Sequence, residues 1–302
     1  MIEILAAVAS VVTDVRCPVP PAVQVDGFRH KRTKAIAKAA SSNHRGIDLL
    51  VSEDDAKQVI AGKLAYGKLD KDSEDEDAEV FACVDDAWKS LGVARTNDDG
   101  RFKIELTDKA RLPVGMRDLY VGARGDGTGS YFVAYVAAKN DAVAVTDIDG
   151  TISWSENSII KTVASRDHDI KHRPGAPEAL AQLTLPIVYT TARGDVFLDV
   201  TRKWLERHGF PRGILRLSQG VFAKPGASAI NYKTATLKSF TVKIAFGIGN
   251  RKSDITAYTN AGLSAKQIFI HLPEYAKELK RDLDAGKATG FDEYAKLKAL
   301  LP

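Results

Sequence analysis

Two aspartates at the end of an apolar run are the residues best suited to chemistry in this sequence. The run AVAVTDIDGTIS covers residues 142–153 and places Asp147 and Asp149 one residue apart, followed by Gly150 and Thr151. Two like charges this close repel each other, and the repulsion grows where water is excluded. A bound cation would remove this conflict, and a phosphate group bound with it would give the two carboxylates a chemical role, so we expect both at this position.

Further polar residues stand where other apolar runs end. LPIVYTT is followed by Ala-Arg, and VKIAFGIG is followed by Asn-Arg-Lys-Ser-Asp. These segments and the stretch between them supply six more candidates: Thr191, Arg193, Lys233, Asn250, Arg251 and Asp254. Thr190 and Lys238 are the neighbours most easily confused with Thr191 and Lys233.

These residue types fit phosphoryl transfer. An aspartate can attack phosphorus and form an acyl phosphate, and carboxylate and carboxamide oxygens suit Mg²⁺. A lysine and hydroxyl groups can hold the nonreacting phosphate oxygens. Each motif alone has a simpler explanation, since a lone D-x-D is commonly a turn or a calcium-type loop and GNRKSD can be a helix N-cap. Their order along the chain favours one catalytic set.

The elements that must position these residues alternate between strands and helices. Apolar runs predict strands, and helix-prone stretches separate most of them. The strands are expected at 142–147, 185–191, 213–218, 242–249 and 267–272, with helices at 176–183, 196–209 and 253–262. This alternation predicts an α/β domain with a doubly wound, mostly parallel sheet covered on both faces. Ligands bind beyond the carboxyl ends of the strands in such sheets, where the candidates lie.

The part of the chain before residue 141 has a different pattern of residues. Short β-rich runs with turn signals between them fill residues 44–140 and predict an antiparallel β-sandwich. The acidic run 70–77 lacks the ligand spacing of a calcium loop and is interpreted as a solvated loop. The basic stretch 28–40 is interpreted as a solvated helix face, with contact to a phosphate or an anionic membrane as the alternative. The 302 residues therefore divide into 1–43, helical or irregular, 44–140 and 141–302.

The composition is that of a globular protein with a core. Hydrophobic residues make up 44% and charged residues 27% of the chain, and the net charge of +4 is compatible with an anionic partner. The two cysteines, Cys17 and Cys83, are interpreted as unpaired thiols. No run is long enough for a membrane helix. Residues 1–16 are interpreted as a helix rather than a signal peptide, so we expect a cytoplasmic or peripheral-membrane location, with secretion as an open alternative.

The order of the motifs resembles that of the haloacid-dehalogenase (HAD) superfamily of phosphohydrolases, whose signature DIDGT matches. Within that superfamily, TDIDGTI, YTTAR and FGIGNRKSDITAY are most similar to the lipin-type phosphatidate phosphatases and to the related C-terminal domain of phosphatidylinositol-transfer proteins. The resemblance covers residues 141–275 and implies an uncapped HAD-like fold. The β-sandwich before it is reminiscent of the immunoglobulin-like (or transthyretin-like) domain of lipins. The extra Ile-Gly in FGIGNR is a departure from the pattern.

The resemblance implies a catalytic centre that holds Mg²⁺. Asp147 would be the nucleophile, and Asp149 would be the general acid and then the base. The ion would be held by Asp147, by the backbone carbonyl of Asp149, and by Asn250 or Asp254. Asn250 stands where the superfamily usually has an aspartate, and lipin-type enzymes share this difference.

The resemblance also implies a substrate site. Thr191 and Lys233 would bind the phosphoryl group, and Lys233 is chosen because YKTATL resembles the lysine-x-x-x-Leu pattern of the family. The remaining substrate-binding residues would be Gly150, Thr151, Arg193 and Arg251. A flap-like segment carries further residues, interpreted as headgroup contacts or exposed loop residues: Arg166, His168 and His172. Trp154 is interpreted as ordinary packing, with contact to lipid as the alternative.

The implied function is Mg²⁺-dependent hydrolysis of phosphatidate through an aspartyl-phosphate intermediate, giving diacylglycerol and phosphate. The alternatives are a HAD phosphatase of another phosphomonoester, such as a nucleic-acid end or a soluble metabolite, and a non-catalytic module that binds phosphatidate. The lack of room for a large cap predicts an open site, which suits a membrane-borne substrate and peripheral contact with an anionic membrane. No basic groove with interleaved aromatic residues is evident, so no nucleic-acid partner is expected.

Overall fold

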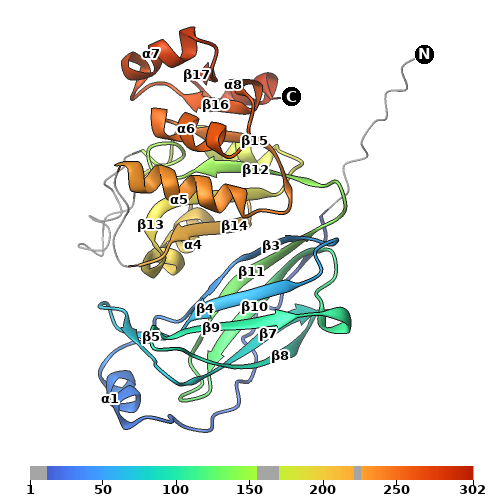
Figure 1. The fold of residues 1–302 in the computed structure, drawn as a ribbon, viewed down its shortest axis with the longest axis vertical. Helices are drawn as coiled ribbons and strands as arrows, with labels where there is room; N and C mark the ends of the chain where they lie inside the picture. Colours follow the sequence, from blue (N-terminus) through green and yellow to red (C-terminus); the bar gives the residue numbers. More distant parts are fainter. Residues whose placement is uncertain (1–11, 155–169, 221–225, 302) are drawn as a thin grey trace.

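The computed structural model describes residues 12–154, 170–220 and 226–301 of the chain. Figure 1 shows two domains along the longest axis, with β-sheets below and a sheet flanked by helices above. The predictions made for residues 1–11, Arg166 and His168 lie outside the described residues.

The lower domain is built from two main β-sheets. One has the strand order β3-β11-β10-β7-β8, with β1 paired to β10, and the other has the order β2-β4-β9. Most neighbouring strands are antiparallel, whereas β3–β11 and β1–β10 are parallel. The antiparallel β-sandwich predicted for this part of the chain is confirmed. Its strands, with the short pair β5–β6, are β1 (Asp14–Val15), β2 (Arg45–Ile47), β3 (Leu49–Ser52), β4 (Gln58–Lys63), β5 (Ala65–Tyr66), β6 (Lys71–Asp72), β7 (Asp77–Val84), β8 (Ala87–Arg95), β9 (Arg101–Leu106), β10 (Gly115–Ala123) and β11 (Gly129–Ala137).

Side chains from both sheets form the core of the sandwich. Ile60 and Phe102 come from the smaller sheet, and Leu119, Val121 and Phe132 come from the larger one. Burying one such side chain contributes about 1.5–3 kcal/mol. The two sheets are therefore held together mainly by apolar contact.

A disulfide attaches the N-terminal segment to the sandwich. Cys17 is bonded to Cys83 of β7 across a sequence separation of 66 residues, and both residues are buried. The prediction of two unpaired thiols is wrong, because pairing of β1 with β10 brings the N-terminal segment onto the sheet that contains β7. A contact over this separation leaves no local pattern in the sequence.

The acidic run 70–77 is less solvated than its composition suggests. Asp70 and Glu76 are only 6% and 3% exposed. Asp70 accepts two hydrogen bonds of 2.7 Å from Arg45 and one of 2.9 Å from Lys63. The interpretation of a solvated loop is wrong for these two carboxylates, because Asp70 pairs with buried cations and Glu76 accepts hydrogen bonds from two backbone amides.

The basic stretch 28–40 contains a helix, α1 (Lys31–Ala39), whose side chains are mostly exposed, as predicted. The acidic run balances part of its charge. His30 lies 2.9 Å from Asp75, and Arg32 donates to Glu74 at 3.1 Å. The positive charge available to a membrane or a phosphate is reduced accordingly.

The upper domain has a six-stranded parallel sheet with the order β14-β13-β12-β15-β16-β17. All five predicted strands are present, and β12 and β14 have their predicted bounds. The sequence patterns do not predict β17, α5, α7 or α8. The strands are β12 (Ala142–Asp147), β13 (Ile187–Gly194), β14 (Gly213–Ser218), β15 (Lys243–Gly249), β16 (Ile268–His271) and β17 (Thr289–Phe291). The helices are α3 (Ala176–Ala181), α4 (Leu198–Arg207), α5 (Gly226–Lys238), α6 (Lys252–Asn260), α7 (Ala276–Asp284) and α8 (Tyr294–Leu300).

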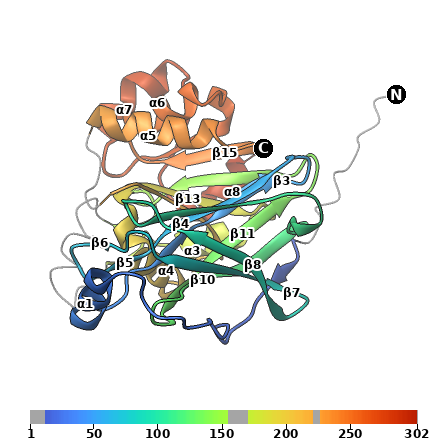
Figure 2. The same cartoon turned by 60° about the horizontal axis from the view of Figure 1, so that its bottom comes forward.

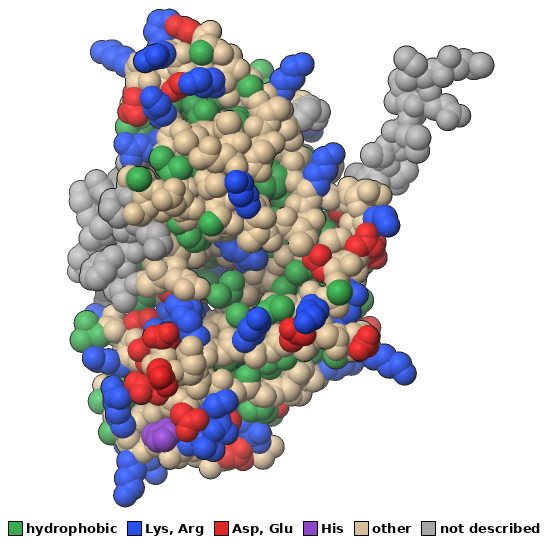
Figure 3. Space-filling model, in the orientation of Figure 1, with side chains coloured by type: hydrophobic (Ala, Val, Ile, Leu, Met, Phe, Trp, Pro, Cys, Tyr) green, Lys and Arg blue, Asp and Glu red, His purple; other side chains and the backbone are tan. Residues whose placement is uncertain are grey.

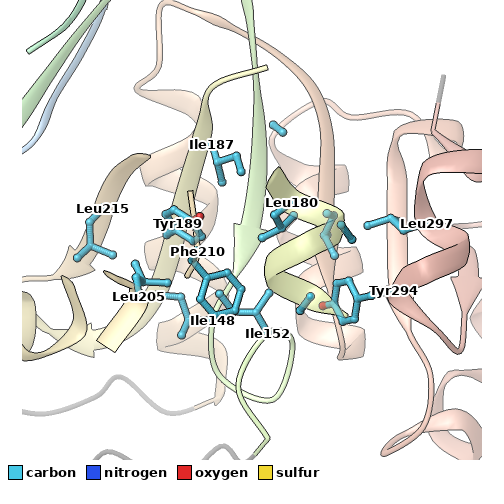
Figure 4. Close-up of a cluster of buried hydrophobic side chains, with 14 of the residues drawn as sticks. Ile148, Ile152, Leu180, Ile187, Tyr189, Leu205, Phe210, Leu215, Tyr294 and Leu297 are labelled. Carbon is cyan, nitrogen blue, oxygen red and sulfur yellow. The ribbon is translucent and has the colours of Figure 1, made fainter. Parts of the chain in front are cut away.

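Helices cover both faces of this sheet, as predicted. On one face, α3, α4 and α8 enclose a cluster that includes Tyr189, Leu205 and Tyr294 (Figure 4). On the other face, α5, α6 and α7 contribute to a second cluster, and Figure 2 shows these three helices grouped at the top of the view, above β15. Successive residues of β13 alternate between the two clusters, with Tyr189 in the first and Val188 in the second. This alternation explains why its sequence is apolar at consecutive positions.

The sandwich also packs on the second cluster, and two buried aspartates bridge the junction. Asp48 of the sandwich accepts hydrogen bonds from the Leu215 amide at 2.7 Å and from Arg202 at 2.8 Å. Asp195, after β13, accepts hydrogen bonds of 3.1 Å from Arg45 and from Arg101 of the sandwich. The two domains are thus joined by both apolar packing and buried ion pairs.

Candidate functional site

The DIDG segment forms a tight turn at the carboxyl end of β12. Asp147 is the last residue of the strand and is 3% exposed, whereas the side chain of Asp149 is 21% exposed. Gly150 has a φ of 77°, a conformation that favours glycine. Its carbonyl accepts hydrogen bonds of 3.1 and 3.0 Å from Nε and Nη2 of Arg173. Arg173 was not among the predicted residues, and no sequence motif marks it.

Lys233 of α5, the lysine predicted for the site in preference to Lys238, lies between two carboxylates. Its Nζ donates to Asp147 Oδ1 at 2.5 Å and to Asp254 Oδ1 at 2.6 Å, while Lys238 is exposed at the end of the same helix. Burial raises the pKa of Asp147 to about 7, although Lys233 opposes the rise. Burial by itself would lower the pKa of Lys233. The attraction of the Asp147 and Asp254 carboxylates is stronger and raises the pKa well above its usual value. The lysine therefore stays positively charged.

Thr151 brings Asp147 and Asn250 together. The Thr151 hydroxyl lies 2.8 Å from Asp147 Oδ2 and 3.1 Å from Asn250 Oδ1, so two oxygens face one hydroxyl group. The buried Nδ2 of Asn250 has no hydrogen-bond partner among the described residues. Asp254 Oδ2 instead accepts the backbone amides of Asn250 and Arg251 at 3.1 and 3.0 Å, at the start of α6. Both oxygens of Asp254 are therefore engaged by donors.

Asp149 is held by two residues from the end of β13. Arg193 donates through Nε to Asp149 Oδ1 at 2.9 Å, and its Nη2 donates to the same oxygen. Thr191 donates to Asp149 Oδ2 at 2.6 Å. The neighbouring Thr190 points elsewhere and donates to the backbone carbonyl of Thr146. The structure thus brings Thr191, not Thr190, to the DIDG turn.

The rim of the site carries aromatic and cationic side chains. Trp154 is 53% exposed and lies 5.2 Å from the Arg173 guanidinium, so the expectation that it serves ordinary packing is wrong. Arg251 stacks over the Tyr275 ring at 4.6 Å. His172, predicted as a headgroup contact or loop residue, packs its ring against His208 at 5.2 Å.

The charges of the site do not balance. Asp147, Asp149 and Asp254 face two cations in direct hydrogen-bonding contact, Lys233 and Arg193. When Asp147 is ionised, these carboxylates exceed the directly bonded cations by one negative charge, which would repel a phosphate dianion. No group of three or more His, Cys, Asp or Glu side chains in the described ranges is arranged to hold a metal ion, so the Mg²⁺ site stays a prediction.

Comparisons with known proteins find a similar family for each of the two domains. Residues 144–271 match the family model described as PITM 1-3, LNS2 domain, and residues 42–136 match PITM 1-3, beta-sandwich domain. Residues 144–271 are therefore similar to LNS2 domains. This type of domain is related to the HAD and lipin-type domains, which agrees with the observed fold.

Two of the three relatives described here are membrane-associated proteins by name. The chain is 29% identical over 257 residues to membrane-associated phosphatidylinositol transfer protein 3 of Homo sapiens, covering 83% of this chain and 26% of that protein. It is 28% identical to membrane-associated phosphatidylinositol transfer protein 1 of Homo sapiens, covering 83% of this chain and 20% of that protein. It is 29% identical to protein retinal degeneration B of Drosophila melanogaster, covering 80% of this chain and 19% of that protein. It thus spans about a quarter or less of their length and is distantly homologous to them.

Among solved structures, a ferredoxin-NADP+ reductase from Plasmodium falciparum matches at 10% identity with a TM-score of 0.21, covering 78% of this chain and 96% of that one. A similarity this low carries no argument about fold or function.

Proposed function

We propose that the α/β domain, which is similar to LNS2 domains, binds the phosphomonoester headgroup of a membrane lipid, phosphatidate or a close analogue, at the DIDG turn. The observation that carries the proposal is the convergence of Asp147, Lys233, Thr191 and Asn250 at the carboxyl ends of the parallel strands. The names of the relatives, which are membrane-associated phosphatidylinositol transfer proteins, support a lipid ligand.

We further propose that binding requires Mg²⁺. The excess negative charge of the site disfavours a phosphate dianion, and a divalent cation would reverse the sign of that charge. Asp147 Oδ2 and Asn250 Oδ1 face the same hydroxyl and are oxygen donors of the kind that Mg²⁺ prefers. With the Asp149 backbone carbonyl they would hold the ion, while Asp254 caps α6. The bound ion would supply positive charge to the phosphate oxygens.

The hydrogen bonds of the Asp149 carboxylate favour binding of the lipid without its hydrolysis. A general acid must direct a protonated oxygen towards the leaving group. Both oxygens of Asp149 accept hydrogen bonds, from Arg193 on one side and Thr191 on the other. In this arrangement the carboxylate holds Arg193 in place, and neither oxygen is poised to deliver a proton.

The second candidate function is hydrolysis of the same phosphomonoester, because Asp147 keeps the position of a nucleophile beside Lys233. Its carboxylate would form a bond to phosphorus as the bond from phosphorus to the lipid oxygen breaks. The lipid oxygen would take a proton from Asp149, which would first have to release Thr191. Water would then cleave the aspartyl phosphate and release inorganic phosphate.

We propose peripheral contact with the membrane next to the site. No helix in the described ranges is long and apolar enough to cross a membrane. Trp154 is exposed five residues after Asp149, and Arg173 links it to the carbonyl of Gly150. Tryptophan favours the interface between water and lipid, so Trp154 is suited to rest there while a headgroup enters the site.

The test combines two measurements on the full chain. Sedimentation with phosphatidylcholine vesicles should increase strongly when they contain phosphatidate, only with Mg²⁺, and far less when they contain phosphatidylserine, an anionic phosphodiester. Phosphate release from phosphatidate in mixed micelles should stay at background. Asp147→Asn should abolish the Mg²⁺-dependent binding, whereas Asp199→Asn, which changes an exposed aspartate of α4, should not.

Each outcome has one meaning. Sustained phosphate release that is lost in Asp147→Asn and Asp149→Asn would establish the hydrolase and refute the non-catalytic module. Equal binding to phosphatidate and phosphatidylserine would refute recognition of a phosphomonoester. Binding that persists in EDTA would refute the role of Mg²⁺.

A further inference from the structure

A groove between the two domains shares no residue with the DIDG site. Its volume is about 430 Å³. The sandwich side is lined mainly by aliphatic side chains of β2, β3 and β4: Ile47, Leu49, Leu50, Val51, Val59 and Ala61. Arg216 of β14 and Thr241 line it from the α/β domain. Figure 3 shows the surface hollowed between the two domains, with apolar side chains and Lys or Arg side chains around the hollow.

Arg216 differs from the other arginines at this junction. Arg45, Arg202 and Arg212 each form an ion pair with a buried or half-buried aspartate. Arg216 donates to the backbone carbonyl of Asp48, and within the described part of the chain it forms no ion pair with a carboxylate. Its guanidinium charge is therefore only partly compensated by the protein.

The surroundings of Arg216 orient it for a ligand. The guanidinium lies over the Phe240 ring, 5.7 Å from its centroid, and such stacking fixes the plane while leaving an edge free to donate hydrogen bonds. Burial lowers the pKa of Arg216, although the Asp48 carboxylate opposes the shift. A cation held in an apolar groove is stabilised by an anionic partner.

The acidic side chains that line the groove have other partners. Asp48 accepts hydrogen bonds from Arg202 and from the Leu215 amide. Asp55 accepts hydrogen bonds from Thr241 at 2.5 Å and from the Ser52 amide at 3.0 Å. Arg202 balances the charge of Asp48, whereas Asp55 bonds only neutral donors. Lys57, the second cation that lines the groove, pairs with Glu105 at 2.9 Å, so Arg216 is the lining cation without a carboxylate partner among the described residues.

We propose that this groove binds a single-chain carboxylate amphiphile, such as a fatty acid, with its carboxylate on Arg216 and its chain along the aliphatic wall. A volume of 430 Å³ accommodates roughly fourteen water-sized groups at ~30 Å³ each. Laurate, with twelve carbons and two oxygens, matches that size. Pockets of this volume, lined by aliphatic side chains with one oriented polar group, are typical of small-ligand sites.

Isothermal titration calorimetry of the full chain with laurate below its micelle concentration tests the proposal. We expect one saturable site per chain. Arg216→Gln should weaken binding at least tenfold, and Ala61→Phe, which fills the groove from the opposite wall, should do the same with Arg216 intact. Arg32→Gln is the matched control, because Arg32 is an exposed arginine of α1 that pairs with Glu74. Dodecyltrimethylammonium, which has the same chain length and a positive headgroup, should not bind.

The proposal is overturned if wild-type protein shows no saturable laurate binding. It is also overturned if Arg216→Gln binds laurate as well as Arg32→Gln does, or if the cationic amphiphile binds as well as laurate. Circular dichroism of each variant establishes that a lost site does not reflect a lost fold. Ala61→Phe keeps the test decisive if Arg216→Gln fails to fold.

Discussion

Replacing Lys233 by methionine should destabilise the α/β domain strongly. The Nζ of Lys233 donates to Asp147 and Asp254 at 2.5 and 2.6 Å, and the three side chains are 9%, 4% and 1% exposed. Removing one partner of a buried ion pair costs about 3–5 kcal/mol. Lys233 serves two carboxylates, so we expect the upper part of that range. Thr151 and the amides at the start of α6 remain as donors and keep the loss from exceeding it.

The assay is urea and thermal unfolding followed by circular dichroism at pH 7.5. A loss of about 4–5 kcal/mol corresponds to a fall in the midpoint temperature of roughly 8–20 °C for a domain of this size. Lys238→Met is the matched control, because Lys238 lies on the same helix but is exposed, and its change should stay within about 0.5 kcal/mol. A loss below about 1 kcal/mol in Lys233→Met, or an equal loss in the control, would refute the reasoning that Lys233 compensates two buried charges.

The remaining predictions concern the sandwich and the junction. Cys17→Ser opens a loop of 66 residues and should lower the free energy of unfolding by up to about 4 kcal/mol, as should reduction of the wild type with dithiothreitol; equal urea midpoints with and without reductant would contradict the Cys17–Cys83 bond. Burial lowers the pKa of His44 from 6.5 to about 4. Between these two pH values the unfolded state binds a proton that the folded state does not, so the free energy of unfolding should rise by up to about 3 kcal/mol as the pH increases from 4 to 6.5. His44→Gln should flatten that part of the pH profile, and an unchanged slope would show that other groups cause it. Asp195→Asn removes the charge partner of Arg101 and leaves Arg45 paired with Asp70 alone, so it should cost about 1.5–3 kcal/mol in thermal or urea unfolding, whereas a cost near zero would mean that the ion pairs of Asp195 do not stabilise the junction.

Part of the site could be read from local sequence patterns. A strand buried on both faces must be apolar at consecutive positions, so the runs at 142–147 and 213–218 predict β12 and β14 with their observed bounds. Parallel strands present their carboxyl ends on one edge of the sheet. The residues that follow them are therefore expected to meet, and the structure does bring Asp147 and Asp254 to the same lysine. Their chemical roles stay predictions.

Other features depend on contacts between distant residues, which leave no periodic pattern in the sequence. Asp149 and Arg193 are 44 residues apart, and their ion pair changes the interpretation of Asp149 from a free acid to an engaged one. The acidic run 70–77 looks solvated from its composition, yet Asp70 is buried against Arg45. A charge pattern shows that charged residues are present but does not show which of them will meet.

The sequence by itself determined the alternation of strands and helices, the sandwich before it and the cluster of polar residues at the strand ends. Only the tertiary structure decided the partners: Cys17 with Cys83, Asp195 with two arginines of the sandwich, and Arg173 with the carbonyl of Gly150. The physical reason is that local periodicity reflects which face of an element is buried, whereas hydrogen bonds and ion pairs between distant residues depend on how the buried faces pack together.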